Sequence, residues 1–152
     1  MYSCRKMRER RFDKREDEEE STLRQLNNVI IRLDEVKNVC NNVLESGNSD
    51  RARLYMSKIA ELYDQFNELS LKYIKFLAIQ DNPQKGLNEL ENVMAINEST
   101  ETFFNTFEID VDDVITQNFL NLETYKGLFL LLSQKYHLAL KSFETILNAD
   151  AS

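Results

Sequence analysis

The sequence predicts an all-α fold of about five helices, and three observations lead to this prediction. Two heptad series of apolar residues run through residues 21–80, at the spacing of helices that pack against one another. Only three glycines and one proline occur among 152 residues, so few positions suit tight turns or sheet corners. No stretch alternates apolar and polar residues as a half-buried strand does. The apolar share of 42%, with nine Phe and six Tyr, is enough for a core of this size.

Residues 1–20 form a charged amino-terminal segment. Residues 1–15 hold seven Arg or Lys against Glu9 and Asp13, and residues 16–20 are all acidic. The only large apolar side chains here are Tyr2, Met7 and Phe12. This composition favours a disordered arm, with a continuation of the first helix toward its amino end as the alternative.

Two long helices should follow, over about 21–45 and 50–80, and form an antiparallel, coiled-coil-like hairpin. The first seam is Leu26, Val29, Leu33, Val36, Cys40 and Val43. The second seam is Tyr55, Ile59, Leu62, Phe66, Leu69, Tyr73 and Phe76. Between them Gly47 can take the left-handed conformation that ends a helix, and Asn48, Ser49 or Asp50 can cap the next.

Three shorter helices are expected in the carboxy-terminal half. Pro83 suits the first turn of a helix over about 84–96, and Asn97–Asp113 should hold a short helix followed by a loop. Asp110 or Asp112 can cap a fourth helix that ends at Leu132, and a fifth spans about 136–148. We therefore expect residues 21–152 to form one helical domain, with the long hairpin at 21–80 and the carboxy-terminal helices at 84–152.

Residues 120–152 carry a resemblance to a known repeat. Gly127 and Ala139 stand where a tetratricopeptide repeat has the small residues at which its two helices approach. The aromatic and core positions of the second helix match Tyr136, Leu140, Phe143 and Leu147. The segment also resembles the helical repeats of proteasome-lid and signalosome subunits that carry a PCI domain. It departs from the pattern at Glu123 and Lys126, where the repeat prefers a bulky aromatic residue and Leu.

The resemblance implies a partner-binding surface. In a tetratricopeptide-like arrangement the first helix of the hairpin lines a groove. Its candidate partner-binding residues are Asn121, Thr124, Leu128 and Leu131.

The sequence offers no set of residues suited to catalysis or to metal binding. His137 is the only histidine, and Cys40 occupies a core position of the first seam while Cys4 lies in the charged segment. The acidic run Glu108–Asp113 lacks the glycine and the distant glutamate of a calcium loop, so helix capping is the preferred role. The three glycines are isolated and form no phosphate-binding loop. We expect a protein that is no enzyme, with no catalytic residue, cofactor or metal.

A basic cluster in the charged segment offers an alternative function. Such a cluster can contact phosphates or act as an import signal. Its members are Arg5, Lys6, Arg8, Arg10 and Arg11. A small nucleic-acid-associated protein is therefore the second hypothesis. Glu9, the adjoining acidic run and the net charge of −7 all oppose it, because they repel a polyanion.

The sequence as a whole predicts a non-catalytic helical interaction or scaffold module, a subunit of a larger complex. Apolar anchors on its helices would bind a helical protein partner. The protein could form a homodimer as the alternative to a monomeric bundle, because the second helix is long and rich in aromatic residues. No segment has the apolar length of a membrane span or the character of a signal peptide, so we expect an intracellular protein in the cytoplasm or nucleus.

Overall fold

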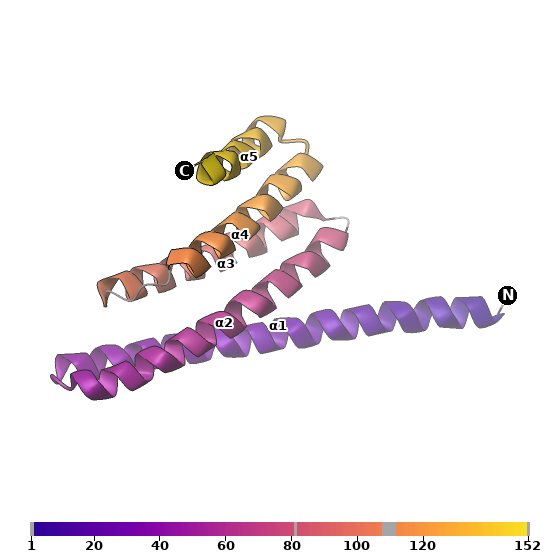
Figure 1. The fold of residues 1–152 in the computed structure, drawn as a ribbon. Helices are drawn as coiled ribbons and strands as arrows, with labels where there is room; N and C mark the ends of the chain where they lie inside the picture. Colours follow the sequence, from indigo (N-terminus) through magenta and orange to yellow (C-terminus); the bar gives the residue numbers. More distant parts are fainter. Residues whose placement is uncertain (1, 81, 108–111, 152) are drawn as a thin grey trace. The chain divides into compact units, whose positions relative to one another are not determined.

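The computed structural model confirms the all-α prediction. It describes the backbone of residues 2–80, 82–107 and 112–151, and the side chains of 17–80, 82–107 and 117–149. Those residues form five helices and no strand (Figure 1). The chain divides into two compact units, Met1–Tyr73 and Ile74–Ser152. The division falls inside the second helix, which the uninterrupted heptad pattern could not reveal.

The first unit is built from α1 (Tyr2–Glu45) and most of α2 (Ser49–Ile79). The turn between them has the hydrogen bonds of a Schellman motif, in which Gly47 N donates to Leu44 O and Asn48 N donates to Val43 O. Gly47 has a φ of +84°, the left-handed conformation predicted for it. Asn48 then caps α2, because its side-chain oxygen accepts a hydrogen bond from Arg51 N at 3.1 Å.

Both predicted seams are confirmed by burial. Every seam residue of α1 and α2 is buried or half-buried, and Leu33, Cys40, Ile59 and Phe66 are almost inaccessible. Near the turn, the Cys40 thiol donates a hydrogen bond to the backbone oxygen of Ala52 at 3.7 Å, and this bond joins the two helices. The hairpin therefore begins where the sequence places it.

The charged segment has helical backbone from Tyr2 onward, where the sequence favoured a disordered arm. The basic side chains of residues 5–11 lie outside the described side chains.

The third helix is longer than predicted. α3 spans Pro83–Thr106, with Pro83 in its first turn and Asn82 as its cap. The prediction of a short helix and a loop after Asn97 is thus wrong up to Thr106, because α3 continues to that residue. Asn97, Thr100 and Phe104 are all buried and continue the inward face of Leu90 at helical spacing. Thr and Asn are weak helix formers, so this burial was hidden in the sequence.

The remaining helices are α4 (Asp112–Leu132) and α5 (Tyr136–Ala151), close to their predicted bounds. The proposed cap Asp110 lies outside the described residues. The turn between α4 and α5 repeats the hydrogen bonds of the first turn, with Lys135 N donating to Leu130 O and Gln134 N to Leu131 O. Here Gln134 takes the left-handed position, with φ 61°.

Two glycines set how closely the helices of the second unit approach. α4 packs between α3 and α5 (Figure 1). A Cβ atom on Gly86 of α3 would lie about 2.5 Å from the ring of Phe129 on α4, and one on Gly127 of α4 would lie about 2.7 Å from the ring of Phe143 on α5. Each ring therefore occupies the space that a side chain would need.

We predict that Gly86→Ala destabilises the protein more than Gly127→Ala. The ring of Phe129 is fully buried and cannot move aside, so overpacking costs about 1–3 kcal/mol, against a gain of about 1 kcal/mol in helix propensity. Phe143 is half-buried and can turn outward, so the two terms nearly cancel at Gly127. Urea denaturation of both variants measures the difference. Equal free energies of unfolding for the two variants would contradict it.

Candidate partner-binding groove and apolar stripe

A groove of about 430 Å³ lies within the second unit and is lined by α3, α4 and α5. Its apolar lining consists of Leu87, Leu130 and Leu138, one from each helix. A second hollow of about 270 Å³ adjoins it between α3 and α4, and Leu87, Glu91 and Lys126 line both. The volume of the groove falls in the range of sites that bind a small molecule or a peptide side chain.

Two polar residues of the groove are nearly buried. Glu123 on α4 is 6% exposed and Ser142 on α5 is 4% exposed. Among the described residues, neither side chain has an ion-pair or hydrogen-bond partner. The carboxylate oxygens of Glu123 are not fully enclosed, because the described side-chain atoms that are buried without a hydrogen-bond partner belong to Asn67, Ser70 and Ser133.

Three lysines line the groove together with Glu123. Lys126 is half-buried, while Lys135 and Lys141 are exposed. Glu91 on α3 adds a second carboxylate, on the exposed side. None of these four charged groups forms an ion pair within the described part of the chain. The groove thus offers charges of both signs to an occupant.

The opposite side of α5 carries an exposed apolar stripe, formed by Tyr136, Leu140, Phe143 and Leu147. These residues are spaced by four, three and four positions, which places them on one face of a helix. Tyr136, Leu140 and Leu147 are 63%, 55% and 67% exposed, and Phe143 is half-buried. The buried face of α5 is separate from the stripe and includes Ala139 and Ser142.

The four residues nominated from the sequence lie outside both hollows. Asn121 accepts a hydrogen bond from Gln117, and the Thr124 hydroxyl donates to Leu120 O, so local contacts satisfy both polar groups. Leu128 is half-buried, and Leu131 is 44% exposed.

Leu131 is at the same level of the hairpin as part of the apolar stripe. Gly127 meets the ring of Phe143, and α4 and α5 run antiparallel from their short turn. One turn further along α4, Leu131 is therefore level with the turn of α5 that carries Leu140.

The groove residues were missed, although the sequence held a signal for them. Glu123, Lys126 and Leu130 follow one another at helical spacing within a leucine-rich helix. Two charged residues on the inward side of such a helix are unusual. In the sequence they stood out only as departures from the repeat pattern.

The other sequence candidates form no site in the described parts of the chain. His137 is exposed at the start of α5, and the acidic run at 108–111 lies outside the described residues. No three His, Cys, Asp or Glu side chains with described positions cluster closely enough to hold a metal ion. None of the helices, over their described lengths, is apolar and long enough to cross a membrane.

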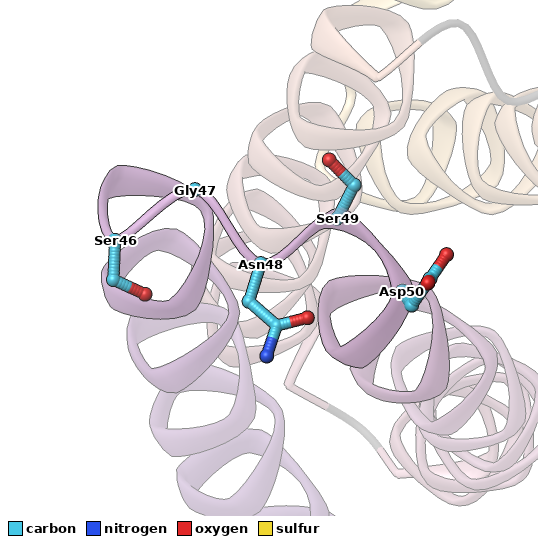
Figure 2. A pocket seen from close by; sticks show the side chains of 5 residues that line it. All are labelled: Ser46, Gly47, Asn48, Ser49 and Asp50. Atoms are coloured by element: carbon cyan, nitrogen blue, oxygen red, sulfur yellow. The ribbon is translucent and has the colours of Figure 1, made fainter.

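A shallow hollow also lies over the turn from α1 to α2. Figure 2 shows the residues that line it, Ser46, Gly47, Asn48, Ser49 and Asp50. The Ser46 hydroxyl donates to Val43 O, and Asn48 caps α2, so both side chains serve the turn itself. We assign no binding role to this hollow.

No family model matches the sequence, and no curated protein or solved structure is detectably similar to the chain. The likeness of residues 120–152 to tetratricopeptide and PCI-type repeats therefore stays a prediction. Any functional conclusion has to come from the groove and the stripe.

We predict that Cys40 resists alkylation in the folded protein. Burial raises the pKa of this thiol, so less reactive thiolate is present at pH 8 than in a free cysteine. Iodoacetamide labelling of a Cys4→Ser variant, followed by mass spectrometry, should be at least about tenfold slower in buffer than in urea. Equal labelling rates in both solutions would show that the first unit opens near its turn.

Proposed function

We propose that this protein is a non-catalytic helical interaction module whose carboxy-terminal hairpin binds a helical segment of a partner protein. The apolar stripe of α5 is the observation that supports the proposal. Six of the ten large hydrophobic residues that are exposed among those described fall within residues 131–147. Exposed apolar side chains that cluster in this way mark interaction surfaces, whereas single ones are ordinary.

The geometry of the stripe indicates the kind of partner. A stripe with spacings of four, three and four residues repeats the pattern by which one helix packs along another. A partner helix with apolar residues at the same spacing could cover Tyr136, Leu140 and Leu147 together. Burial of each large side chain contributes about 1.5–3 kcal/mol before the costs of association are subtracted.

The wider role follows from this proposal. A module of this kind is a scaffold or a subunit of a larger complex, and its scarce cysteines fit a reducing compartment such as the cytoplasm or the nucleus. A second copy of the chain is the competing occupant of the stripe, because a helix with one exposed seam can also pair with itself.

We predict that Leu140→Glu combined with Leu147→Glu abolishes partner binding without unfolding the protein. Both side chains are mostly exposed, so charge is tolerated in the free protein but would be buried in the complex. Leu54→Glu is the matched control, because Leu54 is 73% exposed on α2, outside the stripe. The measurement is capture of proteins from cells. We expect partners that bind the wild type and Leu54→Glu but are lost from the double variant, and the segment of each partner that binds would then be mapped.

The binding segment should be a helix with apolar residues at the spacing of the stripe. If the double variant captured the same proteins as the wild type, the proposal would be contradicted. Light scattering of the purified protein addresses the competing occupant. A dimer that the double substitution dissociates would show that a second copy, and no partner protein, covers the stripe.

A further inference from the structure

The groove of the second unit contains an acceptor site that the protein itself leaves empty. Glu123 lines the groove, and only 6% of the residue is exposed. It has no ion-pair or hydrogen-bond partner among the described residues. Its carboxylate oxygens are not fully enclosed, so they reach the open space of the groove, where no described protein group pairs with them. A cationic hydrogen-bond donor entering the groove would supply the missing interaction.

Ser142 supplies a second polar group to the same groove. A serine within a helix commonly bonds its hydroxyl to the backbone oxygen four residues earlier. Among the described residues this hydroxyl has no such partner, although Ser142 is only 4% exposed. It can therefore accept a hydrogen bond from a ligand that also reaches Glu123. Together the two groups favour a ligand with several donors.

The charges and apolar side chains of the lining narrow the choice of ligand. Lys126, Lys135 and Lys141 all line the groove without an ion pair among the described residues, so they favour carboxylates on the occupant. Leu130 is buried and Leu138 half exposed, and both offer contact to an aliphatic chain. An inorganic anion would meet the lysines but also the carboxylate of Glu123, which repels it.

We propose that this groove binds one arginine side chain of a partner protein, from a segment with acidic residues beside that arginine. The guanidinium presents five donors in a plane, enough for the carboxylate of Glu123 and the hydroxyl of Ser142 together. Its methylene groups lie along the leucines, and the neighbouring acidic residues face Lys135 and Lys141. A lysine has a compact, strongly hydrated charge and fits two separate acceptors less well.

This inference rests on the proposed function in one respect, since the occupant belongs to a partner protein. The surfaces themselves are different. Leu138 and Lys141 line the groove, whereas Leu140 and Leu147 belong to the apolar stripe on another side of α5. A partner could bind through the stripe alone, so the two proposals can fail separately.

The test uses the full chain and two capped synthetic peptides, Asp-Leu-Arg-Leu-Asp and the same peptide with citrulline in place of arginine. Citrulline has nearly the shape of arginine but carries no charge. Fluorescence anisotropy of labelled peptides should show tighter binding of the arginine peptide by about tenfold, which corresponds to one charge-assisted hydrogen bond. Glu123→Gln should bring the two affinities within about twofold of each other.

Glu144→Gln is the matched control, because Glu144 is an exposed carboxylate of α5 outside the groove. It changes the net charge equally and should keep the tenfold preference. Thermal unfolding gives an independent readout. The arginine peptide should raise the Tm of the wild type but not of Glu123→Gln.

Three results would overturn the proposal. The first is equal affinity of the wild type for the two peptides, and the second is a preference for arginine that persists in Glu123→Gln. The third is no binding of the arginine peptide at about 1 mM, the weakest affinity that would matter for a complex. If any of these occurs while substitutions in the apolar stripe still abolish partner capture, only the groove assignment fails.

Discussion

The close approach of α4 to both of its neighbours is the constraint on which the second unit depends. Phe129 fills the space beside Gly86, and Phe143 fills the space beside Gly127, so each ring takes the place of a missing side chain. The close contact brings Ala139 and Ser142 of α5 onto α4 and leaves the longer side chains of α5 on its outer sides. The apolar stripe and the groove are these two outer sides.

The sequence predicted the elements of the fold better than their limits. Heptad spacing identified the seams of α1 and α2, because apolar periodicity reports which face of a helix is buried. It failed after Asn97, where Asn, Thr and Phe continue a buried face with residues that are individually weak helix formers. It also gave no sign of the division at Tyr73, since a helix can pass between two compact units without any change in its own pattern.

The site was harder to predict, for a related reason. A repeat resemblance directs attention to positions that match, and it pointed to Leu128 and Leu131 on the apolar side of α4. Glu123 and Lys126 entered the sequence argument only as mismatches. Whether a charged residue in a helix is solvated or buried depends on the helices packed beside it, which spacing alone does not specify. Only the packing of α3 and α5 on α4 shows that Glu123 lines a groove and has no partner among the described residues.

Glu123 also determines the shape of the groove. It places a charged group on a face of α4 that is otherwise apolar at Leu130. Phe or Leu at this position would extend the apolar contacts of Leu130 and close the groove. A charged residue that keeps a groove open is best explained by the bound state, in which a cationic donor pairs with it. The stripe of α5 follows the same logic, because exposed leucines become favourable only when another helix covers them.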